Sequence, residues 1–110
     1  MSEVPVGQAG ILISALSASG TIGGPIDLGG TCRNVGVYIV FSTGTTAGTV
    51  VTEESPINPF AGTWANIATS AWSAANAITK VNFVGVVRWI QCRISVAIAG
   101  GTVSVYLWAN

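Results

Sequence analysis

The stretch that decides the fold is residues 86–108, which read VVRWIQCRISVAIAGGTVSVYLW. Apolar side chains recur in it at every second position, which is the spacing of a β-strand that buries one face. The pattern stops at Gly100 and Gly101 and then resumes. A glycine pair between two alternating runs favours a tight hairpin turn. The stretch therefore predicts a hairpin of two antiparallel strands, at 86–99 and 102–108.

The longer of these strands has two different faces. Trp89 and Arg93 lie on the side opposite the row that is predicted to face the core. Tryptophan and arginine are enriched at protein interfaces, whereas the open face of a strand is usually polar. Trp89 and Arg93 are therefore candidate interface residues, and Tyr106 and Trp108 on the shorter strand join them. The predicted core row is Val86, Arg88, Ile90, Cys92, Ile94, Val96 and Ile98.

Turn signals divide the rest of the chain into short segments. Glycines cluster where tight turns are expected, and valine, isoleucine, threonine and aromatic residues dominate between them. Further strands are expected near residues 11–17, 35–41, 49–54 and 78–83. The alanine-rich residues 67–77 are expected to form a loop with at most one helical turn. These features predict an all-β fold, an antiparallel β-sandwich, with a jelly roll as the expected wiring.

The length of the chain sets its domain organisation. A chain of 110 residues accommodates one domain with one ordinary core. Residues 1–10 lack periodicity and are expected to form an extended N-terminal arm, and residues 11–110 a single β-sandwich domain. In an assembly the arm would pair with the edge of a neighbour's sheet, which makes Val4 and Val6 further interface candidates. The alternative is a disordered tail.

The composition describes a surface that is poor in charge. Half of the residues are hydrophobic, only 7% are charged, and the net charge is zero, whereas about 25% charged is typical. The lack of a basic excess argues against binding to nucleic acid or to a membrane surface. Residues 11–18 are too few to span a membrane, and a secretory signal is not expected because the first basic residue is Arg33. We expect a soluble chain with much of its surface against other subunits.

No pattern of residues indicates catalysis, a cofactor or a metal site. The chain has no histidine, the commonest general base and metal ligand. Glu53 and Glu54 are neighbours on a predicted strand, so their side chains point to opposite faces and cannot flank a substrate. They are expected to be solvated or to pair with Arg88 or Arg93. Two cysteines without histidine do not make a four-ligand zinc site.

One resemblance joins two parts of the sequence. The first part runs from residues 49–55 to Phe60-Ala61-Gly62-Thr63-Trp64 and Ile67, and the second is the stretch 87–107. This order resembles small β-sandwich virion proteins of tailed bacteriophages, including head decoration (cement) proteins. The resemblance covers residues 35–107.

The resemblance implies a non-enzymatic decoration protein that binds the phage head shell and stabilises it through apolar and aromatic contacts. Its partners would be the major capsid protein and copies of itself, in a trimer that suits the three-fold sites of the shell, with a dimer as the next choice. It would lie on the outer surface of the virion after assembly in the bacterial cytoplasm, without nucleic acid, membrane or cofactor.

The alternative function is that of a tail or fibre module that recognises a host-surface glycan. The direction of the aromatic side chains distinguishes the two functions. Rings that point into subunit contacts favour the decoration protein, and rings that line a solvent-facing groove favour glycan recognition.

The resemblance also bears on the two cysteines. Phage structural proteins are made in a reducing cytosol, where disulfides are uncommon. Cys92 lies on the predicted core row, where a thiol behaves as a small hydrophobic group. We therefore expect Cys32 and Cys92 to be free thiols.

Overall fold

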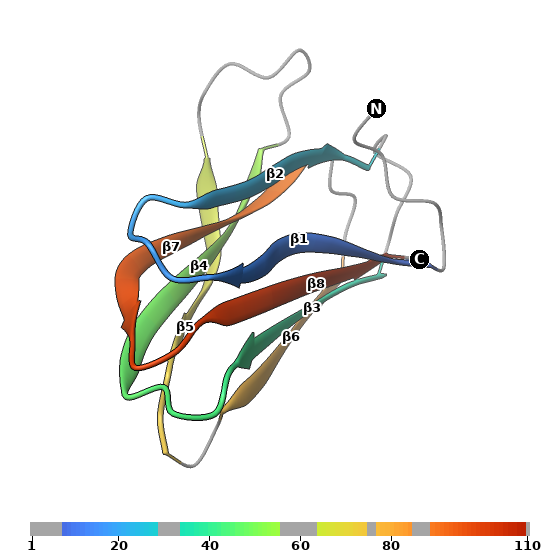
Figure 1. Cartoon of the computed structure of the whole chain (residues 1–110). Helices are drawn as coiled ribbons and strands as arrows, with labels where there is room; N and C mark the ends of the chain where they lie inside the picture. Colours follow the sequence, from blue (N-terminus) through green and yellow to red (C-terminus); the bar gives the residue numbers. More distant parts are fainter. Residues whose placement is uncertain (1–7, 29–33, 56–63, 75–76, 85–88, 110) are drawn as a thin grey trace.

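The computed structural model describes residues 8–28, 34–55, 64–74, 77–84 and 89–109. In these ranges 77% of the residues lie in strands and none is helical. The strands form two four-stranded antiparallel sheets that pack as a sandwich, which confirms the predicted all-β class and architecture (Figure 1). The strands are β1 (Gln8–Leu16), β2 (Ile22–Asp27), β3 (Asn34–Phe41), β4 (Ala47–Ser55), β5 (Ala65–Ala71), β6 (Ile78–Val84), β7 (Trp89–Ala99) and β8 (Val103–Ala109).

The order of the strands is nested. Sheet A has the order β1-β8-β3-β6, and sheet B has the order β2-β7-β4-β5. The first strand therefore pairs with the last, the second with the seventh, the third with the sixth, and β4 with β5. The chain crosses between the sheets at every connection except the one from β4 to β5. The jelly-roll wiring stays a prediction, for which this nested order is the relevant observation.

The core lies between the two sheets and is built from alternate residues of the central strands. On β8, Val103, Val105 and Leu107 are fully buried, whereas Tyr106 and Trp108 between and beyond them are exposed. Burying such a side chain stabilises the fold by about 1.5–3 kcal/mol. The buried cluster is Ile13, Leu28, Val35, Val37, Ile39, Phe41, Val50, Ile90, Cys92, Ile94, Ile98, Val103, Val105 and Leu107.

The predicted hairpin of the last two strands is wrong. β7 pairs with β2 and β4 in sheet B, and β8 pairs with β1 and β3 in sheet A. Gly100 and Gly101 carry the chain from one sheet to the other instead of folding it back on itself. The alternation is the same in both cases, because two strands that face each other across a core each bury one row.

One position of the predicted core row of β7 is also wrong. Val96 is 53% exposed, although Ile94 and Ile98 on either side of it are buried. The pairing of β7 with β4 shifts register twice here, once on each side of Thr49. A shift of one residue reverses which face the following side chains occupy, so Val96 turns outward and Ile98 returns to the core. Val86 and Arg88 lie outside the described residues.

Two edge strands differ from their prediction. Residues 67–71, expected to be part of a loop, belong to β5, because pairing with β4 overrides the weak strand preference of alanine. Ile22–Asp27 forms β2, although its Gly-Gly-Pro sequence indicates a turn. β2 is an edge strand, and an edge tolerates proline because one side of its backbone needs no partner.

Residues 8–10, which were predicted to belong to the N-terminal arm, lie in a strand. β1 begins at Gln8, so residues 8–10 pair with β8 and belong to the sandwich. Residues 1–7, which include Val4 and Val6, lie outside the described residues. The described residues also contain no helix with the length and hydropathy needed to cross a membrane.

The register shifts in β7 can be tested by a pair of substitutions. Ile94→Ala should lower the free energy of unfolding by about 2–5 kcal/mol, because it opens a cavity in the core. Val96→Ala should cost less than about 1 kcal/mol, because its side chain is exposed. Urea denaturation of both variants measures the difference. Equal costs at the two positions would show that Val96 belongs to the core row and that the register is wrong.

Candidate functional site

On the outer face of sheet A, one residue from each of the four strands lies in a row across the sheet. The register places Ile11 opposite Tyr106, Tyr106 opposite Tyr38, and Tyr38 opposite Lys80. These residues therefore form one row across the whole sheet. The two tyrosine rings lie on the central strands β8 and β3 because the neighbouring residues of those strands fill the core.

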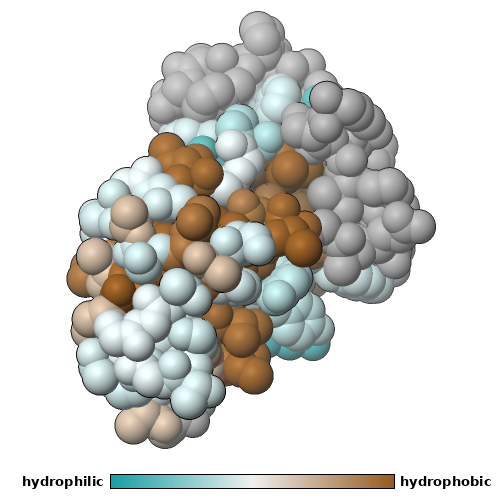
Figure 2. Space-filling view, viewed as in Figure 1, coloured by the Kyte–Doolittle hydropathy of each residue, from teal (hydrophilic) through white to brown (hydrophobic). Residues whose placement is uncertain are grey.

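A second row lies beside the first. Gly36 on β3 is opposite Trp108 on one side and Asn82 on the other. We call the two rows together the aromatic face, which consists of Ile11, Gly36, Tyr38, Lys80, Asn82, Tyr106 and Trp108. Figure 2, viewed as in Figure 1, shows hydrophobic residues in patches among weakly polar ones on this side of the molecule.

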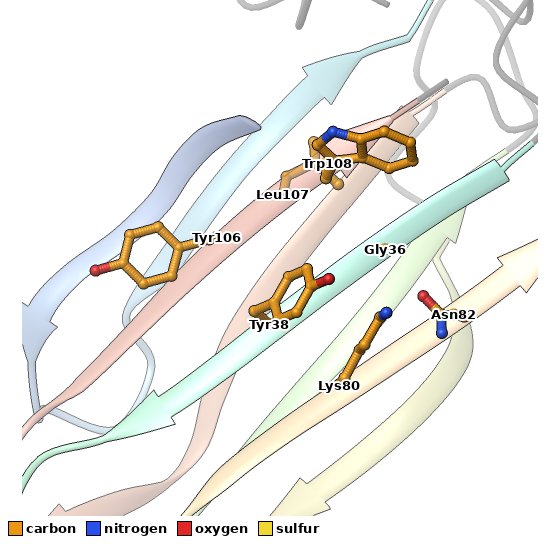
Figure 3. Close-up of a pocket in the computed structure, with 7 residues that line it drawn as sticks. All are labelled: Gly36, Tyr38, Lys80, Asn82, Tyr106, Leu107 and Trp108. Atoms are coloured by element: carbon orange, nitrogen blue, oxygen red, sulfur yellow. The ribbon is translucent and has the colours of Figure 1, made fainter. Parts of the chain in front are cut away.

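The aromatic face contains a groove of about 310 Å³. Gly36 leaves its centre open, since a Cβ added there would approach Oδ1 of Asn82 to 3.2 Å. Trp108 and Tyr38 stand on either side of the open position, and Lys80 and Asn82 close the groove along β6 (Figure 3). The groove is therefore a solvent-facing hollow with aromatic walls and two polar side chains at one margin.

Lys80 supplies the charge of this face. Its ammonium nitrogen lies 5.3 Å from the centre of the Tyr38 ring, within the range of a cation–π interaction. Among the described residues of the aromatic face, Lys80 is the one with a charged side chain. The face is therefore weakly positive and suits an uncharged or anionic partner.

The groove carries groups that can hold a ligand. Ring faces, one ammonium group and one amide can hold a ligand by packing and hydrogen bonds. The described lining residues include no carboxylate, thiol or imidazole that could act as a base or nucleophile. In the described part of the chain, no three histidine, cysteine, aspartate or glutamate side chains gather as a metal site would require.

The structure divides the predicted interface residues between two surfaces. Tyr106 and Trp108 belong to the aromatic face of sheet A. Trp89 and Arg93 lie on the outer face of sheet B, where Trp89 is half-buried opposite Ser55 and Asp27. A single interface on one face therefore cannot use all four of the described candidates.

Arg93 has a partner on its own sheet. Its Nε and Nη2 atoms each lie 3.3 Å from a carboxylate oxygen of Glu53, and Nε2 of Gln91 donates to Glu53 Oε1 at 2.9 Å. Burial alone would raise the pKa of Glu53, but the hydrogen bonds from Arg93 and Gln91 and the positive charge of Arg93 offset it, so the net pKa is lowered. The expected pairing of a glutamate with Arg93 is confirmed, and Glu54 lies in the other row, opposite Ile90.

The sequence analysis missed Tyr38, Lys80 and Asn82. Alternation in 35–41 does place Tyr38 outside the core row, and this signal was sufficient to predict its exposure. Alternation does not show which strands are neighbours. The meeting of Tyr38 with Tyr106, which are 68 residues apart in the chain (106 − 38), depends on the pairing of β3 with β8.

Cys92 is a buried free thiol, as predicted, and Cys32 lies outside the described residues. Burial raises the pKa of the Cys92 thiol to about 11, and the Thr52 hydroxyl lies 3.6 Å from its sulfur. The thiol is therefore protonated at neutral pH and acts as part of the core.

Comparison with known proteins found no family model, no curated protein and no solved structure that matches the chain. The functional interpretation below therefore depends on the resemblance of residues 35–107 and on the geometry of the two outer faces.

The Glu53 network gives stability a defined pH dependence. Because its pKa is lowered in the folded state, Glu53 contributes stability above its unfolded pKa, and this contribution is lost as the pH falls through the folded pKa. As the pH falls below about 5, the free energy of unfolding of Glu53→Gln should decrease less steeply with pH than that of the wild type. Urea denaturation at a series of pH values measures the slopes.

The matched control is Glu54→Gln, which removes a carboxylate from the other row of β4. It should keep the wild-type slope, because the Glu53–Arg93 pair remains. A Glu53→Gln variant with the wild-type slope would show that this pair does not couple folding to pH.

Proposed function

We propose that this chain is a non-enzymatic structural protein of a tailed-phage particle. It is a decoration protein that binds the outer surface of the head shell and stabilises it. The aromatic face of sheet A docks on the major capsid protein through apolar and aromatic contacts. The resemblance of residues 35–107 to small virion β-sandwiches supports the class of protein, and the aromatic face supports the mode of binding.

The observation that carries this proposal is the exposure of aromatic rings on two central strands. Tyr38, Tyr106 and Trp108 are 36%, 37% and 38% exposed. Tyrosine and tryptophan are the residues that most often dominate the energy of an interface. Ile11 and Ile78 extend the apolar surface to both margins of sheet A, further than the groove itself reaches. A surface of this breadth suits a protein partner better than a small ligand.

The strand order is compatible with the proposed class. We interpret the nested pairs, from β1 with β8 to β4 with β5, as a jelly roll made of two Greek keys. Viral capsid proteins and lectins both use this wiring. The wiring therefore supports a virion or sugar-binding protein, and the surface distinguishes between the two.

Recognition of a host-surface glycan is the second candidate function. The groove at Gly36 favours it, because exposed rings beside Asn82 and Lys80 can stack on a sugar and hydrogen-bond to its hydroxyl groups. The solvent-facing groove meets the criterion given above for glycan recognition, but the exposed apolar surface continues beyond it to Ile11 and Ile78, and for that reason we rank glycan recognition second. Under this alternative the chain belongs to a tail or a fibre.

Substitution of Trp108 tests the docking surface. Trp108→Ala should weaken binding to isolated head shells of the cognate phage by about 30-fold or more, the effect of losing a hot-spot residue. Ile22→Ala is the control, since Ile22 is an exposed apolar residue on the edge of the other sheet. It should bind like the wild type. Co-sedimentation with shells measures the affinity, and circular dichroism checks that each variant is folded.

Adding Trp89→Ala to this set of proteins separates the candidates. If Trp89→Ala were the only substitution that weakened binding to shells, the docking surface would be assigned to sheet B. The decoration role would be contradicted if the wild-type protein did not bind shells but bound a polysaccharide. Loss of that binding in Trp108→Ala would establish the glycan module.

A further inference from the structure

The edge of sheet A at β6 differs from the other three sheet edges. Edge strands of natural sheets usually carry bulges, proline or charge, which prevent pairing with another chain. β1 has two register shifts, β2 has a shift and Pro25, and the pairing of β5 with β4 has a shift. β6 pairs with β3 from Ile78 to Val84 without a shift, contains no proline, and carries one of the three protective features, the charge of Lys80 (Figure 1). It is the most regular open edge of the described sandwich.

The backbone groups on the open side of β6 can be assigned from the ladder. The Phe41 N–H donates to the Ala77 carbonyl at 2.9 Å, in the same register as the β3–β6 pairing. In an antiparallel ladder, hydrogen-bonded and non-hydrogen-bonded pairs alternate. The odd positions of β6 therefore bond to β3, and the even positions, which are Ile78, Lys80, Asn82 and Val84, direct their N–H and C=O groups to the open edge.

The side chains of the even positions are exposed on the outer face. Ile78 is 63% exposed and Val84 is 82% exposed, which makes Val84 the most exposed large hydrophobic residue described. They lie at opposite ends of β6, with Lys80 and Asn82 between them. The order apolar, lysine, amide, apolar is self-complementary. When a second copy of the strand lies antiparallel to the first, each apolar end faces an apolar end and each lysine faces an amide.

We propose that β6 is a self-association edge, at which two copies of the chain pair antiparallel about Val81. Ile78 of one copy then lies opposite Val84 of the other, and Lys80 opposite Asn82. The N–H and C=O groups of the even positions form hydrogen bonds across the interface, because each even position of one copy lies opposite an even position of the other. The interface is isologous, as a two-fold dimer requires.

Charge and overlap together select this register. Moving the strands so that Lys80 faces Lys80 places like charges directly opposite each other, which destabilises a sheet pair. Moving them the other way sets Asn82 against Asn82 and leaves Ile78 without a partner position. The register centred on Val81 is the one that pairs all even positions and opposes no like charges.

The dimer has a consequence for binding. It joins two copies of sheet A into one continuous sheet, so that two aromatic faces lie on the same surface. A partner with repeated sites, such as a shell, could then be bound at two points, which raises the overall affinity without any new contact. The inference concerns the free protein and predicts a two-fold dimer in place of the trimer expected from the sequence.

Disulfide trapping tests the register. The double variant Ile78→Cys/Val84→Cys, in a Cys32→Ser background, should form a covalent dimer under mild oxidation, since hydrogen-bonded antiparallel pairs have Cα atoms about 5.5 Å apart, within disulfide range. Each single variant should stay uncrosslinked, because the same residue in the two copies is about 20 Å apart. Non-reducing electrophoresis gives the result. Crosslinking by Lys80→Cys alone or Asn82→Cys alone would overturn the register.

Charge variants of Asn82 test the dimer without new cysteines. Asn82→Glu should tighten self-association by about fivefold, because it faces Lys80 of the other copy at both symmetric positions, and Asn82→Lys should weaken it by a similar factor. Ala18→Glu and Ala18→Lys, in the exposed turn after β1, make the same changes in net charge and should leave the affinity unchanged. Sedimentation velocity over a concentration series measures each affinity. A monomer at every concentration, a trimer, or equal effects at positions 18 and 82 would overturn the proposal.

Discussion

The rest of the structure depends on the burial of one row of side chains from each central strand between the two sheets. On β8 this row is Val103, Val105 and Leu107, each fully buried. At about 1.5–3 kcal/mol for each side chain, burial of this row favours the observed orientation of the strand over the opposite one by several kcal/mol. A slip of one residue would exchange the two faces and expose the whole row. The same constraint holds Tyr106 and Trp108 outside, so the aromatic face follows directly from the core.

The two outer faces that result differ in how their polar groups are used. On sheet B, Arg93 is bonded to Glu53, and Gln91 completes the carboxylate's hydrogen bonds, so the charges of this face are largely compensated within the chain. On sheet A, the ammonium group of Lys80 lies over an aromatic ring. Sheet B therefore presents an ion pair formed within the sheet, and among the described residues of the aromatic face on sheet A the one charged side chain is Lys80. This difference is the physical reason to place docking on sheet A.

Alternation in the sequence was sufficient to predict what each strand buries, and it was insufficient wherever the answer depended on a neighbouring strand. Ile90, Cys92 and Ile94 were predicted correctly from period two alone. Val96 was not, because the register shifts beside it arise from pairing with β4. The separation of β7 and β8 into different sheets has the same origin, since a hairpin and a sheet-to-sheet crossing show the same alternation. Of the candidate site, Tyr106 and Trp108 were identified, whereas Lys80 and Asn82 join them only through β3.

The most direct test of the account is an electron-microscopy map of the phage head with this chain located in it. The account predicts that the β3–β8 surface lies against the shell, with Trp108 buried in the contact and the sheet-B face with Arg93 directed to solvent. A map in which the shell contacts sheet B, or in which the chain is found in the tail with the groove at Gly36 open to solvent, would contradict it.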